Sequence, residues 1–176
     1  MFNRSRVALV ALAVVGAALT AGISAGPAQA ASGVPIRNFG NRKCLDVATQ
    51  NNYVVQLWSC NGQSQQQWAE NWTGSTLQMA NQRVAGKCLG VEGNATFDGA
   101  RVVVQPCGFA STNWTVSFAN NTGSGWHEQL LNTNSGRCLD LLDNNPANGT
   151  PIQLWDCWPN NPPGNPENNP AQLWML

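Results

Sequence analysis

The chain has 176 residues with nine basic and nine acidic side chains, so its formal net charge at pH 7 is zero. This balance excludes a strongly basic surface of the kind that binds nucleic acid or an anionic membrane. Charged residues are scarce, at 10%, whereas tryptophan, with eight residues, and the amides of Asn and Gln are abundant. Indoles and amides suit a neutral ligand that is rich in hydroxyl groups.

The first 30 residues have the layout of a secretory signal peptide. Arg4 and Arg6 precede an apolar run over 7–19, and small residues around Ala28 and Ala30 provide a cleavage site. An N-terminal anchor helix is the alternative, but the run is shorter than the roughly 20 residues that span a bilayer. We therefore expect cleavage near Ala30, a secreted chain over 31–176 and no membrane insertion. Loss of the two arginines leaves seven basic and nine acidic side chains, a net charge of −2.

Short strands separated by turns are predicted along the rest of the chain. Runs of alternating or β-branched apolar residues lie at 55–58, 101–104, 115–118 and 152–155, with Asn- and Gly-rich turn signals between them. No segment keeps the apolar spacing of an amphipathic helix over three turns. We expect an all-β fold, with a surface loop over the Asn- and Pro-rich residues 158–171.

One sequence unit occurs three times. An upstream block, in which a basic residue precedes Cys-Leu, lies at 43–47, 87–91 and 137–141. A downstream block that ends in cysteine lies at 55–60, 102–107 and 152–157. Each copy closes on a tryptophan: Trp68, Trp114 and Trp174. The upstream cysteines are 44 and then 50 residues apart, a period typical of repeat architectures. We place a first, second and third unit at about residues 36–80, 81–126 and 127–176, with about four strands in each.

All six cysteines fall after residue 31, two in each unit. Pairing within the units joins Cys44 to Cys60, Cys88 to Cys107 and Cys138 to Cys157. The oxidising environment that an exported chain meets preserves such bridges. A zinc site is disfavoured because there is no Cys-x-x-Cys pair and His127, expected at the surface, is the only histidine. We expect no metal and no cofactor.

These blocks carry a resemblance to a known family. Three copies of the Cys-Leu block, the Gln-Leu-Trp-x-Cys block and the Gln-x-Trp block resemble the ricin-B-type lectins and the related carbohydrate-binding modules of bacterial polysaccharide-degrading enzymes. The resemblance extends over residues 31–176. It implies a β-trefoil, in which three four-stranded units surround a pseudo-threefold axis. It also implies that an aspartate, an aromatic residue and an Asn-Gln pair shortly before the last tryptophan bind sugar.

The Asn-Gln pair of the family is altered in this chain. The first unit has Gln65 and Gln66 at these positions, a mild change. The third unit has Ala171 and Gln172, so one hydrogen bond to the sugar is lost there, and we expect the third site to be the weaker one. Candidates to replace that bond lie on the long loop: Trp158, Asn168 and Asn169.

Strand alternation rebuilds the first site from its residues alone. Residues i and i+2 share a face of a strand, so Gln56 and Trp58 point the same way. If the bridge from Cys44 to Cys60 joins directly opposed residues, Asp46 lies opposite Trp58, with Gln56 beside it. The C–H face of a pyranose packs on an indole, and carboxylate and amide groups bind its hydroxyls. The first unit is therefore a predicted sugar site.

The third unit repeats this residue set, and the second unit does not. The same count sets Asp140 opposite Trp155, beside Gln153. The corresponding residues of the second unit are Gly90, Gln105, Val103 and Thr112. We expect two sugar sites, and a second unit that folds but does not bind.

Several of these residues also have a structural interpretation. The tryptophans that close the units are expected in the core, together with the leucines of the upstream blocks. Gln66 and Gln172 either satisfy backbone groups or bind sugar. Asp46 and Asp140 are alternatively turn-forming carboxylates.

The function predicted from these residues is that of a secreted, non-catalytic lectin for galactose- or xylose-type sugars, acting as a monomer and binding in the presence of EDTA. One alternative is a small glycosidase, which needs two carboxylates about 5–10 Å apart, whereas each unit supplies one. The other is a protein-binding trefoil such as a protease inhibitor, because fold does not determine function.

Overall fold

The fold is described by a computed structural model over residues 33–123, 125–158 and 169–176. The signal peptide assigned to residues 1–30 and the candidate Asn168 lie outside these residues. The described secondary structure consists of strands and single 3-10 turns, which confirms the all-β prediction. None of the described helices is long and apolar enough to cross a membrane.

Each unit contributes four strands, and the second and third units begin, with β5 and β9, a few residues before the predicted positions 81 and 127. The first has β1 (Arg37–Asn38), β2 (Cys44–Val47), β3 (Val55–Trp58) and β4 (Trp68–Thr73). The second has β5 (Thr76–Asn81), β6 (Lys87–Val91), β7 (Val102–Pro106) and β8 (Trp114–Thr122). The third has β9 (Gly125–Asn132), β10 (Arg137–Leu141), β11 (Ile152–Trp155) and β12 (Trp174–Met175). The 3-10 turns are η1 (Ser64–Gln66), η2 (Glu92–Asn94), η3 (Ala110–Thr112), η4 (Leu142–Asn144) and η6 (Pro170–Gln172).

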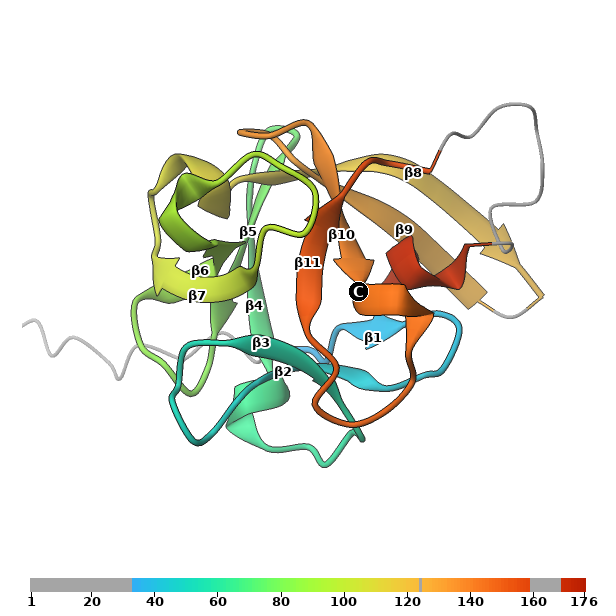
Figure 1. Cartoon of the computed structure of the whole chain (residues 1–176), viewed down its shortest axis with the longest axis horizontal. Helices are drawn as coiled ribbons and strands as arrows, with labels where there is room; N and C mark the ends of the chain where they lie inside the picture. Colours follow the sequence, from blue (N-terminus) through green and yellow to red (C-terminus); the bar gives the residue numbers. More distant parts are fainter. Residues whose placement is uncertain (1–32, 124, 159–168) are drawn as a thin grey trace, which may run out of the picture. The chain divides into compact units, whose positions relative to one another are not determined.

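The outer strands of the units form a barrel, and the inner strands form three hairpins. Strands β4, β5, β8, β9, β12 and β1 pair in that order, all antiparallel, and a bridge between Val34 and Trp68 closes the ring. The hairpins β2–β3, β6–β7 and β10–β11 surround the centre of the domain (Figure 1). Isolated bridges such as that between Val54 and Val103 join neighbouring hairpins. This arrangement is the predicted β-trefoil.

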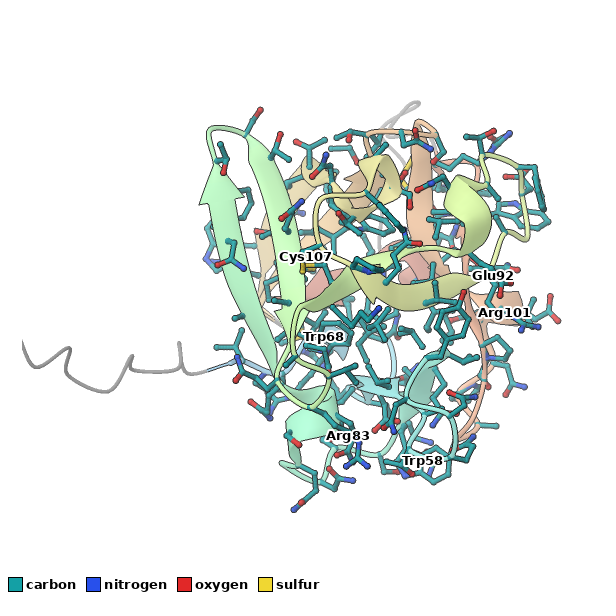
Figure 2. All side chains as sticks on the ribbon, turned by 90° about the vertical axis from the view of Figure 1, so that its left-hand side faces the viewer. Trp58, Trp68, Arg83, Glu92, Arg101 and Cys107 are labelled. Carbon is teal, nitrogen blue, oxygen red and sulfur yellow. A yellow bond between two sulfur atoms is a disulfide. The ribbon has the colours of Figure 1, made fainter. Side chains whose placement is uncertain are left out.

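The same core contact occurs in each unit. The indole N–H groups of Trp68, Trp114 and Trp174 donate to the carbonyls of Leu45, Leu89 and Leu139 at 3.1, 3.0 and 3.0 Å. All six side chains are fully buried, which confirms the predicted core, and Figure 2 shows Trp68 inside the domain. Each indole thus buries a large apolar area without leaving its polar group unpaired.

A buried asparagine also recurs in each unit, and the sequence comparison missed it. The side-chain amides of Asn38, Asn81 and Asn132 donate to backbone carbonyls of the 3-10 turn that precedes a closing tryptophan, or of the residue after it. Each lies six or seven residues before an upstream cysteine, which is the signal that was available in the sequence. These amides connect η1, η3 and η6 to the first barrel strand of the next unit around the pseudo-threefold axis, which is β5, β9 and β1 in turn.

The three predicted disulfides are present, each within one unit. Their Cα–Cα distances are 5.1, 4.9 and 5.0 Å, and the paired cysteines are 16, 19 and 19 residues apart. A loop of that size contributes about 3 kcal/mol to stability in the chain-entropy model.

Each hairpin also packs beside a loop of a neighbouring unit. In the third-unit loop before β11, the Asn148 side-chain oxygen accepts hydrogen bonds from the Ser59 amide at 3.0 Å and the Lys43 ammonium at 2.9 Å. In the second-unit loop, Asp98 accepts a bond from the Asp156 amide at 2.8 Å and forms an ion pair with Arg137. Hydrogen bonds therefore join the first and third hairpins to a loop of a neighbouring unit.

Candidate functional site

The strand register differs from the predicted one by two residues. Asp46 lies opposite Gln56, and Trp58 lies opposite Cys44. The third unit shows the same pairing, with Asp140 opposite Gln153 and Trp155 opposite Cys138. The prediction was wrong because each bridge is diagonal: Cys60 and Cys157 follow the ends of β3 and β11 and bond to a cysteine that is not directly opposite. A shift of two keeps every side chain on its predicted face.

The first unit places Asp46 at the bottom of a hollow of about 200 Å³. One carboxylate oxygen accepts a bond from the Gln56 amide at 3.0 Å, and the other accepts one from the Gln66 amide at 2.9 Å. We call such an aspartate with its two glutamines a carboxylate network. Trp58 is 39% exposed at the rim and lies at the outer edge of the domain in Figure 2. Gln65 also lines the hollow.

The third unit repeats this network around Asp140. Gln153 donates to one carboxylate oxygen at 2.9 Å, and Gln172 donates to the other at 3.2 Å. Trp155, 45% exposed, lines the hollow, which measures about 540 Å³. Ala171 lies in the wall where the first unit has Gln65. The structure therefore brings the predicted residues of each unit together, although the register along the strands differs from the predicted one.

Gln66 and Gln172 hold the network in place from below. Both are buried, and each also donates to a backbone carbonyl, Ser59 at 3.1 Å or Asp156 at 2.9 Å. Their oxygens accept bonds from backbone amides of the residues after Cys60 and Cys157. Their amide groups are therefore engaged within the protein, as the structural interpretation predicts, and their binding to sugar stays a prediction.

The two aspartates keep acceptor capacity despite their burial. Burial raises the pKa of Asp46, and the amides of Gln56, Gln66 and Gln65 act in the opposite direction. Burial likewise raises the pKa of Asp140, opposed by Gln153 and Gln172. A carboxylate has about four acceptor positions, so two glutamine amides leave room for sugar hydroxyls. The turn-forming alternative does not fit, because both aspartates lie within strands.

In the second unit the equivalent space is filled by the protein itself. Gln105 stands at the strand position of Trp58 and Trp155, yet it is only 7% exposed. Its amide donates to the Ser111 hydroxyl, and it lies over Gly90, where an added Cβ would be 2.7 Å from the Gln105 nitrogen. The Ser111 hydroxyl in turn donates to the Asn94 side-chain oxygen at 2.8 Å. The polar groups here satisfy one another.

The sequence predicts that the one histidine, His127, lies at the surface, and this prediction was wrong. His127 is fully buried on β9, with its ring centroid 4.1 Å from that of Phe39. The strand carries it inward between the exposed Trp126 and the half-buried Glu128. Within the described residues, no group of three or more His, Cys, Asp or Glu side chains is placed to hold a metal ion.

A family model for the ricin-type beta-trefoil lectin domain matches residues 32–163. The chain belongs to this family. No curated protein sequence matches it. The solved structures that resemble this ricin-type lectin domain include the designed threefold symmetric protein ThreeFoil, at 22% identity and a TM-score of 0.68, covering 81% of this chain and 95% of that one.

Two further structures resemble the domain. One is the ricin B-like lectin of Macrolepiota procera in complex with lactose, at 24% identity and a TM-score of 0.64, covering 84% of this chain and 96% of that one. The other is an exo-β-1,3-galactanase from Clostridium thermocellum, at 21% identity and a TM-score of 0.67, covering 84% of this chain and 30% of that one. At these identities the likeness shows the fold.

The structure adds lining residues that the repeat comparison did not single out. Thr49, Gln50 and Asn61 line the first hollow, and Asp143 and Asn144 of η4 line the third. They lie in turns that differ between the units in sequence, so a search for shared residues passes over them. Gly149 of the third unit also lies beside the Trp58 ring, because a Cβ added at Gly149 would be 3.8 Å from the indole.

Proposed function

We propose that this chain is a secreted, non-catalytic lectin that binds galactose- or xylose-type sugars through its first and third units. The observation that carries the proposal is the carboxylate network beside a half-exposed indole, which occurs twice with the same hydrogen bonds. A sugar stacked on Trp58 or Trp155 offers hydroxyls at its edge to Asp46 or Asp140. Buried acceptors of this kind favour hydroxyl donors, because water competes weakly there.

Family membership supports carbohydrate binding in general, and the site geometry supports these two units in particular. The leader over residues 1–30 and the three disulfides are what support secretion. The balanced charge of the chain disfavours a nucleic-acid partner.

Isothermal titration of residues 31–176 with galactose, xylose, lactose and xylotriose tests the proposal. We expect at least one of these sugars to bind two sites per chain with a dissociation constant near the millimolar level, about −4 kcal/mol. Absence of heat with all four sugars would refute it. A protease captured by the protein and retained by the double variant Trp58→Ala, Trp155→Ala would instead favour the protein-binding alternative.

One observation bears on the glycosidase alternative. Asp143 and Asp156 line the third hollow together with Asp140, so this site has more carboxylates than the sequence count of one per unit. Asp156 forms an ion pair with Arg137, which engages it outside the network. We expect the protein to release no reducing sugar from xylan or galactan, and release that is lost in Asp140→Asn would establish hydrolysis instead.

A further inference from the structure

The residue after each downstream cysteine occupies an equivalent place in the three units. The backbone amide of Asn61 donates to the Gln66 side chain at 2.7 Å, and that of Trp158 donates to Gln172 at 2.8 Å. The amide of Gly108 donates to the Thr112 hydroxyl at 3.3 Å in the second unit. The backbone of this position is therefore bonded to the residue two before the closing tryptophan in every unit, whichever side chain the position carries.

The side chains at this position differ between the two candidate sites. Asn61 lines the first hollow, and Trp158 lines the third, where its side chain is 52% exposed. The third site thus has two half-exposed indoles, Trp155 and Trp158, around one carboxylate network. The first site has Trp58 alone.

The third hollow, which has two indoles, is also the larger of the two. The third measures about 540 Å³, within the range of about 300–1,000 Å³ that is typical of small-molecule sites. The first, at about 200 Å³, lies below that range. A single sugar ring that stacks on Trp155 and reaches Asp140 leaves the Trp158 indole for a second ring.

We propose that Trp158 is a second stacking platform, and that the third unit binds a neutral oligosaccharide of two or more sugar residues, whereas the first unit binds one residue. This inference rests on the proposed function. It separates two properties of the third site. The missing amide at Ala171 weakens its hold on a single sugar, and the second indole strengthens its hold on a longer one.

The experiment compares the two sites one at a time. Asp140→Ala leaves the first site, and Asp46→Ala leaves the third. Each variant is titrated with galactose and lactose, and with xylose and xylotriose. For the third site we expect the oligosaccharide of at least one pair to bind about tenfold more tightly than the monosaccharide, since stacking contributes on the order of one tenfold step. For the first site the two ligands of a pair are expected to differ by about twofold or less.

Variants at Trp158 in the Asp46→Ala background then locate the effect. Trp158→Asn copies the first unit and keeps the backbone bond to Gln172, so the ratio of oligosaccharide to monosaccharide affinity is expected to fall to that of the first site, at an unchanged melting temperature. Trp158→Phe keeps an aromatic platform and is expected to retain most of the gain. Trp126→Asn, which removes an exposed indole from β9 outside this hollow, is the matched control and should change nothing.

Three outcomes overturn the inference. The first is the same ratio of oligosaccharide to monosaccharide affinity at both sites, and the second is a ratio that Trp158→Asn leaves intact. The third is loss of monosaccharide binding in Trp158→Asn, which would show that Trp158 supports the Asp140 network. Monosaccharide binding without any oligosaccharide gain leaves the proposed function standing, whereas absence of all binding removes both.

Discussion

The second unit has the same hairpin, disulfide and buried tryptophan as the first and third units, but its site position is closed from within. In the first unit a buried carboxylate faces a hollow beside Trp58, whereas in the second the Gln105 amide lies over Gly90 and bonds to Ser111. The fold therefore does not require the carboxylate. Burial raises the pKa of Asp46 and of Asp140, so these two units hold charge at a cost in stability that the second unit avoids.

The largest expected effect comes from removing one of the two carboxylates. Asp46→Ala should halve the number of monosaccharide sites per chain, as measured by calorimetric titration. Its affinity for an insoluble polysaccharide should fall far more, by about 100-fold, because two linked sites on one domain gain avidity that a single site lacks. Binding to the polymer is measured by depletion from solution.

The matched control for this substitution lies in the second unit. Gln105→Ala also removes a polar side chain beside a hairpin, yet it should leave stoichiometry and polymer affinity unchanged. Three equivalent sites in the wild type, or a monosaccharide bound beside Gly90 in a crystal soak, would show that the second unit binds after all.

A smaller effect, on stability alone, tests whether Gln105 really fills the site. An added Cβ at Gly90 would lie 2.7 Å from the Gln105 nitrogen and 3.0 Å from Thr112. Gly90→Ala should lower the free energy of unfolding by about 1–3 kcal/mol, and by less when Gln105→Ala has first made room. Gly123→Ala is the control, since its Cβ position has no neighbour within 4 Å. Equal costs of Gly90→Ala in both backgrounds, measured by urea unfolding, would contradict the close approach.

The smallest effect is the pH dependence of binding in the first and third units. Because the pKa values of Asp46 and Asp140 are raised, protonation begins at a higher pH than for an exposed aspartate. If only the ionised form accepts the sugar hydroxyls, affinity falls about tenfold for each pH unit below the pKa. Titrations over a pH series measure this fall.

Folding stability should change with pH in the opposite direction to sugar affinity. A raised carboxyl pKa means that the folded state binds more protons than the unfolded state within this pH window. The contribution of Asp46 and Asp140 to the free energy of unfolding therefore increases as the pH falls through it. Thermal unfolding at each pH is the control, because it shows whether a loss of affinity comes from loss of the folded state. An affinity that stays constant down to the pH at which an ordinary aspartate is protonated would contradict the role of the carboxylates.

The repeat pattern predicted the fold well because it encodes residues that the architecture needs three times. Trp68, Trp114 and Trp174 each fill the same buried place, and each cysteine pair closes its own unit. The faces of Asp46 and Trp58 were also predictable, since strand alternation depends only on counting.

What could not be predicted depends on packing that the residues shared by the three units do not encode. The register was two residues off because a disulfide after a strand end need not join opposed residues. Gln105 turns inward only because Gly90 and Ser111 make space and a partner for it, which is a property of packing. The burial of His127 against Phe39 brings together residues 88 positions apart, and neither neighbourhood signals it.

The loop around Asn148, which lies against the first hairpin, has a consequence for the order of folding. Its bond to Ser59 joins residues 89 positions apart, and Gly149 forms part of the surroundings of Trp58. During synthesis the residues of the first site emerge early, yet the wall beside Trp58 is finished only after the chain near residue 150 has followed and docked. Such long-range closure is slow compared with hairpin formation. If the first unit binds sugar as proposed, we expect that binding to require a folded third unit.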